Sequence, residues 1–458
     1  MRRYEALILG TSGAAVVDAA AMSTPLLSSC GIEVSSVLPE DQEAGSLDLG
    51  VDESYKLSVT SSECLLQAQT VWGALHGLET LTQLLHREAG GAIYCDYSPA
   101  SVADFPRYTH RGVLLDTARH YLPMILLERA VDSVHMSKFN VLHWHTVDAQ
   151  SFPLDTPSAP KLVQGAFAPQ YTYSMEEVAA LREYAADRGV RLLMELDVPG
   201  HTASWGVGYP DIIPLNCPQK YASNCNNQAL NPTMQATYDV VHQALSDVQA
   251  ATAAKYLHLG GDEVVYGCWT ADPSIVQYMA EHGLSNTDLF ALFIGKVDAM
   301  AAALGTTPIH WEDVFLLGVQ TPPNTIFNVW TNSEQINNVT AAGYRVIAAP
   351  SDFWYLDHAE NTWEVMYAYD PADGISDAQQ RLIIGGETSM WGERVDEDNW
   401  FSKVWPTAAA VGERLWSPRE VRDADSALPR LLAYRCRMGD RGMRSTPVEP
   451  GFCSTVYV

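Results

Sequence analysis

Tyr256-Leu-His-Leu-Gly-Gly-Asp-Glu263 combines a short apolar run, two glycines and two adjacent carboxylic acids. The run has the length of a buried strand, and the glycines allow the chain to turn where that strand ends. From Arg111 onward, seven other short apolar runs alternate with helical patterns. This alternation predicts successive βα units and a parallel sheet.

Eight predicted strands indicate a closed (β/α)8 TIM barrel in preference to an open doubly wound sheet. No Gly-x-Gly-x-x-Gly motif follows an early strand, so the main dinucleotide-binding signature is missing. The predicted strands are Gly112–Leu115, Val141–Trp144, Arg191–Leu196, Tyr256–Leu259, Pro308–Trp311, Ile326–Trp330, Arg345–Ala348 and Leu382–Ile384.

Capping boxes predict where two of the intervening helices begin. Ser174-Met-Glu-Glu177 precedes a helix that we expect to stop at Gly189, and Ser285-Asn-Thr-Asp288 begins one that ends before Gly305. The helix after the fifth strand has a weak pattern, and we expect a loop in its place.

Two domains are expected: a small α/β domain over residues 1–105 and a catalytic barrel with a C-terminal extension over 106–458. The alternation of apolar residues predicts strands in the first domain, and Leu side chains three or four residues apart predict a helix. The expected segments are a strand at Tyr4–Leu9 followed by a helix, paired strands at Tyr55–Ser61 and Glu63–Gln69, a helix from Val71 to Leu85, and a linker with two prolines at Tyr97–Arg107.

The composition excludes several classes of partner. The formal charge is −27, from 28 Lys and Arg against 55 Asp and Glu, and no basic cluster interrupts it. Nucleic-acid binding is therefore not expected, because phosphate recognition needs clustered cations. No apolar run reaches the roughly 18 residues of a membrane span.

The eight cysteines favour a disulfide-forming, secretory-route protein. None lies in a Cys-x-x-Cys motif, so the zinc-ribbon and thioredoxin spacings are missing. Cys436 and Cys453 are candidates for one disulfide. Cys268 is a candidate to pair with either Cys217 or Cys225, and buried free thiols remain the alternative.

Polar and aromatic side chains follow the predicted strands, at the barrel end where chemistry takes place. Aromatic planes pack on sugar rings, and carboxylates with an arginine bind sugar hydroxyls. Glycoside cleavage also needs a proton donor and a group that stabilises an oxocarbenium-like transition state. The candidate residues are Arg119, Asp148, His201, Asp262, Glu263, Trp311, Trp330, Tyr355, Asp357, Trp391 and Glu393.

His143 and His145 support a rival hypothesis, because His-x-His on a barrel strand is a metal-ligand spacing and suggests a metal-dependent amidohydrolase. The motif follows the second strand, and Trp144 and Asp148 fit a sugar hydrolase better. We therefore expect packed, hydrogen-bonded histidines, with no metal or other cofactor. A catalytically silent carbohydrate-binding protein is the second rival.

From about Tyr55 to the C-terminus, the sequence resembles the β-N-acetylhexosaminidases of glycoside hydrolase family 20, of the lysosomal type. The motifs that carry the resemblance are Leu115-Asp-Thr-Ala-Arg119-His120, His143-Trp-His-Thr-Val-Asp148, Val198-Pro-Gly-His201 and His258-Leu-Gly-Gly-Asp262-Glu263-Val264. The resemblance implies an exo-acting, retaining enzyme that releases terminal non-reducing GlcNAc or GalNAc. It also implies substrate-assisted catalysis through an oxazolinium intermediate.

The resemblance assigns roles to the catalytic groups. Glu263 would be the general acid and then the base, and Asp262 would hold the acetamido N–H and balance positive charge. Asp148 and His201 would tune the protonation of Glu263. Arg119 would bind the 3- and 4-hydroxyls of the sugar.

The resemblance also assigns the rest of the pocket. Tyr355 would hydrogen-bond the acetamido oxygen, while Asp357 and Glu393 would contact the 4- and 6-hydroxyls. The pocket walls would be Trp311, Trp330 and Trp391.

The wider expectations concern partners and location. The partner would be an oligosaccharide or glycoconjugate with a terminal β-linked N-acetylhexosamine, and a homodimer remains an option. We expect a lysosomal or secreted glycoprotein, with Asn338-Val-Thr340 as its glycosylation sequon. The first domain looks truncated relative to the family.

Overall fold

The computed structural model describes residues 2–9, 27–35, 47–87, 93–95, 97–218 and 228–453. The chain divides into two compact units. The smaller comprises Met1–Thr109 with Asp187–Gly189, and the larger comprises His110–Ala186 with Val190–Val458.

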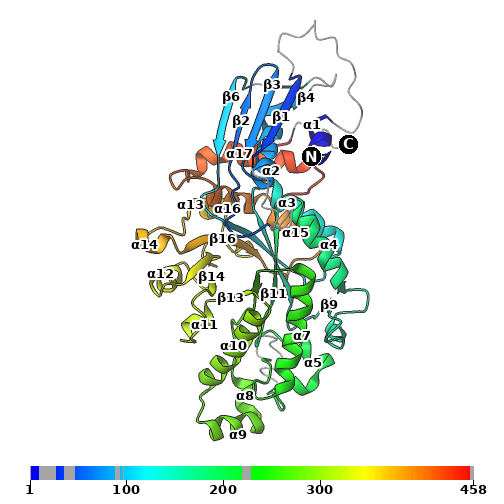
Figure 1. Ribbon diagram of the computed structural model, residues 1–458, viewed down its shortest axis with the longest axis vertical. Helices are drawn as coiled ribbons and strands as arrows, with labels where there is room; N and C mark the ends of the chain where they lie inside the picture. Colours follow the sequence, from blue (N-terminus) through cyan, green and yellow to red (C-terminus); the bar gives the residue numbers. More distant parts are fainter. Residues whose placement is uncertain are drawn as a thin grey trace. The chain divides into compact units, whose positions relative to one another are not determined.

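Eight parallel strands close into a barrel in the larger unit, in the order β7-β8-β11-β12-β13-β14-β15-β16. Strands β11, β13, β14 and β16 of this barrel are labelled in Figure 1. All eight strands predicted from the sequence are confirmed. Several are longer than expected: β7 begins at His110, β8 reaches Val147 and β16 reaches Met390. The strands are β7 His110–Asp116, β8 Val141–Val147, β11 Arg191–Leu196, β12 Tyr256–His258, β13 Thr307–Trp311, β14 Ile326–Val329, β15 Arg345–Ala348 and β16 Ile383–Met390.

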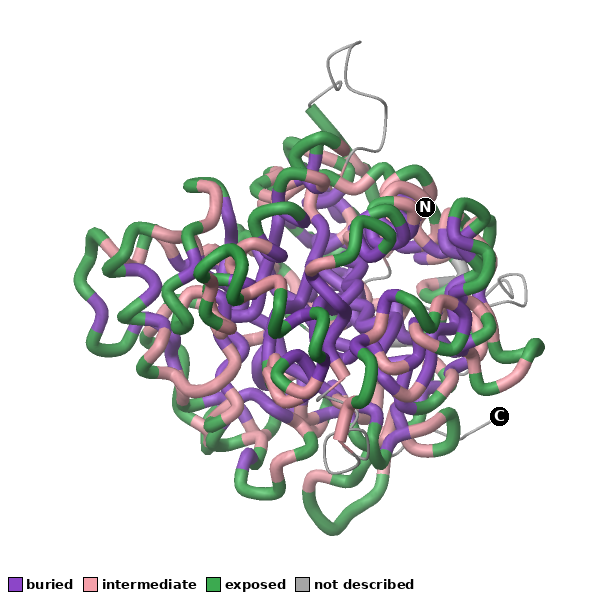
Figure 2. The backbone as a smooth tube through the Cα atoms, turned by 90° about the horizontal axis from the view of Figure 1, so that it is seen from below, coloured by how far each residue is buried: buried purple, intermediate pink, exposed green. Residues whose placement is uncertain are grey.

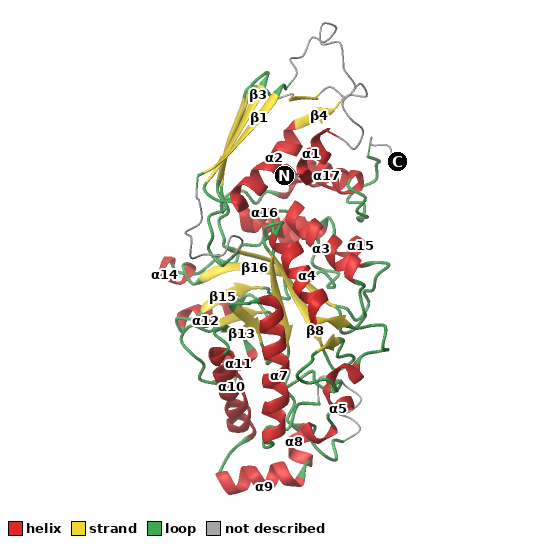
Figure 3. Ribbon diagram, turned by 45° about the vertical axis from the view of Figure 1, so that its right-hand side comes forward, coloured by secondary structure: helices red, strands yellow, loops and turns green. Residues whose placement is uncertain are grey.

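Helices connect the strands and flank them (Figure 3). Both predicted capping boxes form: Ser174 and Glu177 bond reciprocally before α4, and Ser285 and Asp288 do so before α10. After β13 only one short turn, α11, forms, as the weak pattern indicated. The main helices are α3 Met124–Met136, α4 Met175–Ala186, α7 Gln235–Thr252, α10 Asn286–Ala303, α11 Asp313–Leu316, α12 Glu334–Ala341, α16 Thr407–Trp416 and α17 Ala424–Asp440.

Shorter elements lie in the connections of the larger unit. They are β9 Leu154–Asp155, η2 Leu162–Gly165, β10 Tyr173–Ser174, α5 Trp205–Gly208, η3 Pro210–Ile212, α8 Gly267–Ala271, α9 Pro273–His282, α13 Trp363–Ala368, α14 Asp377–Gln380 and α15 Trp400–Val404.

The barrel strands are buried, as expected where helices cover a parallel sheet. Every residue of β7 and β8 is buried, and buried stretches of the chain are purple in Figure 2. An aliphatic cluster takes one side chain from each of five strands, and polar side chains occupy other buried positions on the same strands. The cluster consists of Val141, Leu193, Ile309, Ile326 and Ile347.

The smaller unit contains a four-stranded sheet in the order β1-β3-β2-β6. The predicted pairing of two strands is confirmed as β2 with β3, which run antiparallel, and the predicted helix is α2, whose N-terminus is capped by Thr70. The elements are α1 Arg2–Leu9, β1 Ser29–Val34, β2 Tyr55–Val59, β3 Glu63–Ala68, α2 Val71–Leu84, β4 Leu85–Arg87, β5 Ile93–Cys95 and β6 Ala100–Asp104.

Two expectations for this unit were wrong. Tyr4–Leu9 lies in helix α1 rather than in a strand, and the Tyr4 hydroxyl bonds to Glu79 of α2. A short apolar run can form either a helix or a strand, so its tertiary contacts decide which of the two forms. The expected linker contains an edge strand, Ala100–Asp104, which pairs antiparallel with β2. The helix expected after Leu9 lies outside the described residues.

Three disulfides are present among the residues that the structure describes. Cys436–Cys453 confirms one prediction, and Cys268 pairs with Cys217, the first of its two candidates. Cys225 lies outside the described residues. The third disulfide, Cys30–Cys64, links the paired strands β1 and β3 and was not predicted from the sequence.

Candidate active site

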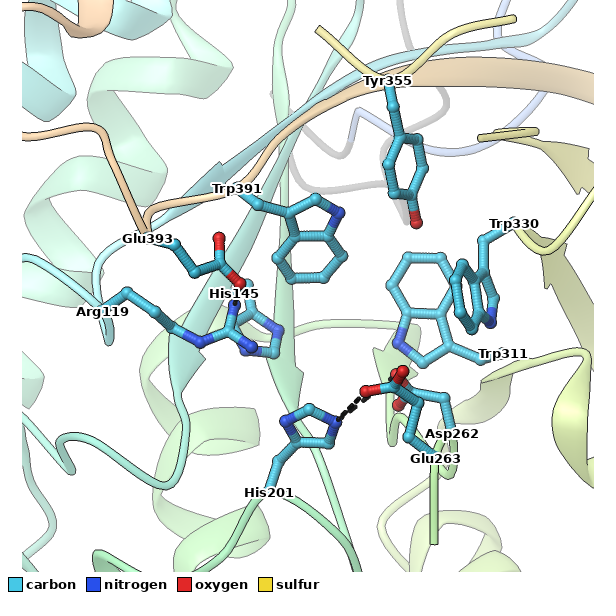
Figure 4. Close-up of a pocket in the computed structure, with 10 residues that line it drawn as sticks. All are labelled: Arg119, His145, His201, Asp262, Glu263, Trp311, Trp330, Tyr355, Trp391 and Glu393. Atoms are coloured by element: carbon cyan, nitrogen blue, oxygen red, sulfur yellow. Dashed lines mark ion pairs between the residues drawn. The ribbon is translucent and has the colours of Figure 1, made fainter. Parts of the chain in front are cut away.

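Residues from all eight barrel strands or the loops that follow them line one cavity of about 220 Å³, shown in Figure 4. In a TIM barrel the carboxyl ends of the strands carry the functional groups, which makes this cavity the candidate active site. The lining residues are Arg119, His145, His201, Asp262, Glu263, Trp311, Trp330, Tyr355, Trp391 and Glu393.

Asp262 and Glu263 both line the cavity because the chain turns sharply after β12. Gly260 and Gly261 have φ angles of +62° and +100°, which glycine adopts readily. A Cβ at Gly260 would lie 1.8 Å from Oδ1 of Asp197, so this position has no room for a side chain. Glu263 itself has a φ of +49°, outside the extended region of a regular strand.

The two acids differ in their access to solvent. The side chain of Asp262 is 11% exposed, whereas that of Glu263 is 41% exposed. Nε2 of His201 lies 3.6 Å from Oδ2 of Asp262 and 3.5 Å from Oε2 of Glu263, as the dashed lines of Figure 4 indicate. One imidazole therefore faces both acids, one of them buried and one open.

Asp148 lies behind His201, with Oδ2 3.0 Å from its Nδ1. Burial alone would raise the pKa of Asp148, but His201 and Arg119 hold it well below its usual range. Burial would likewise lower the pKa of His201, but the carboxylates of Asp148, Asp197 and Asp262 raise it well above its usual range. The arrangement therefore favours an imidazolium at His201, beside Glu263.

The Arg119 guanidinium is fixed by carboxylates. Its Nη1 lies 2.7 Å from Oδ2 of Asp116 and its Nη2 lies 2.8 Å from Oδ2 of Asp148. Glu393 is 3.7 Å away, and the guanidinium carbon lies 5.2 Å from the ring centroid of Trp391. A cation held at several points loses little side-chain freedom when it binds a ligand.

Asp262 has a second carboxyl as its neighbour. Burial raises the pKa of Asp262 well above its usual range, and the nearby Asp197 and Asp313 raise it further. Burial also raises the pKa of Asp197, to about 6. Like charges in close proximity disfavour double ionisation, so the Asp197–Asp262 pair retains a proton more readily than isolated aspartates do.

Aromatic side chains form much of the cavity wall, and the Tyr355 hydroxyl points into the cavity in Figure 4. The Trp311 indole donates to Oε1 of Glu195 at 2.7 Å, and the Trp330 indole donates to Oδ2 of Asp313 at 2.8 Å. The rings of Trp311 and Trp391 are 6.1 Å apart between centroids. Such hydrogen bonds fix the planes on which the apolar face of a sugar packs.

Comparison with known proteins identifies the family. Residues 108–419 match the catalytic-domain model of glycosyl hydrolase family 20, and residues 20–84 match a model described as "beta-acetyl hexosaminidase like". The chain belongs to glycosyl hydrolase family 20.

Individual relatives agree with this family. The chain is 39% identical to beta-hexosaminidase subunit A1 of Dictyostelium discoideum, over 89% of this chain and 77% of the relative. It is 40% identical to beta-hexosaminidase subunit beta of Homo sapiens, over 89% and 74%. The solved Flavobacterium johnsoniae chitobiase is 30% identical with a TM-score of 0.78, and the match covers 87% of this chain but only 61% of that one. The chain is a glycoside hydrolase of the β-N-acetylhexosaminidase type.

Two predicted site residues of this family 20 enzyme do not line the cavity. Asp148 is fully buried behind His201 and Arg119, where it contacts groups that do. Asp357 is exposed, two residues after Tyr355, which forms an isolated bridge with Ser389 of β16. The structure brings the other predicted residues together around the cavity.

Several residues in or beside the site were not assigned roles from the sequence. His145 lines the cavity, Asp197 neighbours Asp262, and Asp313 contacts Glu263 and Trp330. His145 lies within a motif already singled out and Asp197 immediately precedes another, so their strand-end position was the available signal. Asp313 follows Trp311 and Glu312 with no motif of its own.

The histidines of the rival metal hypothesis have carboxylate neighbours at every ring nitrogen. His143 lies 2.9 Å from Glu387 and 3.2 Å from Glu195, and His145 lies 2.6 Å from Glu195 and 2.9 Å from Asp148. Distance alone would let His143 and Glu195 share a cation with the nearby His258. However, His145 is hydrogen-bonded to a carboxylate at both nitrogens, so as an imidazolium it keeps no lone pair for a metal. His143 is hydrogen-bonded to Glu387 through Nδ1, while its Nε2 faces Glu195 without a hydrogen bond.

The buried His143 should make stability depend on pH. Burial would lower its pKa, but Glu387 and Glu195 outweigh this effect and raise it to about 9. The stabilisation is complete below the ordinary pKa of 6.5 and is lost as the pH rises through 9. We expect the thermal midpoint to fall over this range, with a weaker fall in His143→Gln. The control His242→Gln, at an exposed position, should retain the wild-type slope. If the thermal midpoint of His143→Gln fell with pH as steeply as that of the wild type, His143 would not be the source of the pH dependence.

Proposed function

We propose that this protein is an exo-acting, retaining β-N-acetylhexosaminidase that uses substrate-assisted catalysis. It would release terminal non-reducing GlcNAc or GalNAc from oligosaccharides and glycoconjugates. One observation carries the proposal: a buried acid and an open acid, Asp262 and Glu263, converge on a single aromatic-walled cavity beside the fixed Arg119.

In the first step, the acetamido oxygen of the substrate attacks the anomeric carbon as the glycosidic C–O bond breaks. The leaving oxygen takes the proton of Glu263, and an oxazolinium ion forms. The exposure of Glu263 at the mouth suits this role, because the aglycone must leave through solvent.

In the second step, water attacks the anomeric carbon from the face that the aglycone left, and Glu263 takes the proton of that water. The bond from the acetamido oxygen breaks, which restores the acetamido group. Two inversions at one carbon give net retention of configuration.

Asp262 would hold the acetamido N–H and stabilise the cationic intermediate. Its raised pKa fits this role, because an adjacent positive charge lowers a carboxyl pKa. Ionisation of Asp262 would therefore be favoured when the intermediate forms. His201 and Asp148 would adjust the proton affinity of Glu263 through the imidazole that faces it.

The remaining residues would bind the sugar. Arg119 would contact its 3- and 4-hydroxyls, while Glu393 and Asp357 would contact its 4- and 6-hydroxyls. Tyr355 would donate to the acetamido oxygen. The walls around the N-acetyl group and the sugar face would be Trp311, Trp330 and Trp391.

We also propose that the protein follows the secretory route to a lysosomal or extracellular location. Three disulfides support this, because such bonds persist in oxidising compartments. Asn338 of the sequon has an exposed side chain on α12. Among the described residues, no helix is long and apolar enough to cross a membrane.

Turnover of 4-nitrophenyl N-acetyl-β-glucosaminide and its galacto isomer tests the proposal. Proton NMR of the first product formed should show the β anomer, because the mechanism retains configuration. The matched substrate without the N-acetyl group should not be cleaved, because it lacks the internal nucleophile. An initial α anomer, or equal cleavage of the deacetylated substrate, would exclude substrate assistance.

The same assay distinguishes the rival functions. A metal-dependent amidohydrolase would lose activity with a chelator and would not cleave the glycoside. A silent carbohydrate-binding protein would bind N-acetylglucosamine without turnover. We expect glycoside cleavage that a chelator does not affect.

A further inference from the structure

Asp313, the first residue of α11, connects two sides of the cavity. Its Oδ1 accepts the backbone N–H of Glu263 at 3.3 Å, and its Oδ2 accepts the indole N–H of Trp330 at 2.8 Å. Both partners line the cavity, whereas Asp313 does not. We propose that Asp313 is a positioning residue: it fixes the general acid Glu263 relative to Trp330, which forms part of the wall of the N-acetyl pocket. The inference rests on the proposed function.

Each of the two partners lies where regular structure gives little support. Glu263 follows the Gly-Gly turn and has a left-handed backbone, so a bond to its N–H helps to fix the direction of its side chain. Trp330 comes directly after the end of β14 at Val329. The Asp313 carboxylate therefore fixes the distance between Glu263, which transfers the proton, and the indole of Trp330.

The preceding residue reinforces the arrangement. Glu312 is fully buried and accepts the backbone N–H groups of Trp330 at 2.9 Å and Thr331 at 2.8 Å. The Glu312-Asp313 pair thus holds Trp330 by its backbone and its indole together. Because α11 continues directly from β13, both anchors are tied to the barrel wall.

The charge of Asp313 adds a second effect. Its acidic neighbours are Glu263, Asp262 and Glu312. The imidazole of His201 faces both Glu263 and Asp262. Burial raises the pKa of Asp313, while its bonds from Trp330 and Glu263 lower it. An ionised Asp313 disfavours negative charge on Glu263 and thereby favours the protonated form that an acid catalyst needs.

Asp313→Asn tests both effects, since it keeps the side-chain shape but loses the charge and one acceptor oxygen. We expect kcat/KM to fall about tenfold, in line with one lost hydrogen bond, and more for poor leaving groups than for good ones. The alkaline limb of the pH profile should move to lower pH. The inhibition constant of N-acetylglucosamine should rise several-fold.

Asp313→Glu separates charge from position. It keeps the charge but displaces the carboxylate, so the alkaline limb should stay at the wild-type pH while the inhibition constant still rises. Asp352→Asn is the matched control, because Asp352 also accepts loop donors, from Ser333, but is exposed and does not line the cavity. This control should behave as the wild type.

The proposal is overturned if folded Asp313→Asn retains the wild-type pH profile and inhibition constant. If that variant does not fold, a wild-type inhibition constant in Asp313→Glu overturns it instead. Glu263→Gln, measured in parallel, separates the two levels of inference. If it is impaired while the Asp313 variants are normal, only the role of Asp313 fails. If it is fully active, the proposed function fails and the role of Asp313 fails with it.

Discussion

Glu263→Gln is expected to lower turnover of an aryl N-acetyl-β-glucosaminide by roughly 10²–10⁴-fold, the range for loss of a general acid–base group. The amide cannot donate a carboxylic proton to the leaving oxygen, and it cannot take a proton from water. The loss should be smallest for 4-nitrophenolate, which leaves without protonation, and largest for an alkyl glycoside. Steady-state rates over a series of leaving groups measure this dependence.

Glu397→Gln is the matched control, because Glu397 is exposed and does not line the cavity. It should retain wild-type rates with every leaving group. A Glu263→Gln enzyme whose loss was equal across the series would show that Glu263 does not protonate the aglycone. The proposed division of roles between the two acids would then be wrong.

Asp262→Asn is expected to lower turnover by about 10²–10³-fold, the typical effect of removing one preorganised electrostatic group. The amide has no negative charge to balance the oxazolinium ion. The loss should be similar for all leaving groups, because Asp262 acts on the acetamido group rather than on the aglycone. The same substrate series, measured on both variants, therefore distinguishes the two carboxylates.

Wild-type turnover in Asp262→Asn would show that Asp262 does not assist the acetamido group, and the substrate-assisted mechanism would then be wrong. The substitution nearly conserves shape, which matters because the side chain is buried and packed close to Asp197. Circular dichroism and the thermal midpoint report whether the barrel is intact. A folded but slow enzyme is the expected result.

The sequence predicted the barrel well because its signals are local. The buried runs are continuous, some of the turns have a glycine or a capping residue, and the order of these patterns defines βα units. Strand ends such as Gly260-Gly261 then placed the candidate residues on one rim. Strand boundaries were less accurate, as β16 continues to Met390 well beyond the predicted segment.

Features that depend on distant partners were harder to predict. Ala100–Asp104 became a strand because the edge of β2 was available, and its flanking prolines concealed this. Helix α1 is positioned by Tyr4 and Glu79, which are far apart in the chain. Asp148 was assigned near His201, but no sequence pattern showed that it would also bond Arg119. The link from Asp313 to Glu263 has no local signature at all.

The cavity draws residues from every strand of a closed ring, so no subset of strands can assemble it alone. Catalytic competence should therefore return only at the last stage of refolding, after most helical circular dichroism has recovered. Recovery of activity would therefore report that the barrel has closed completely. New chain ends should be tolerated best on the opposite, amino-terminal rim.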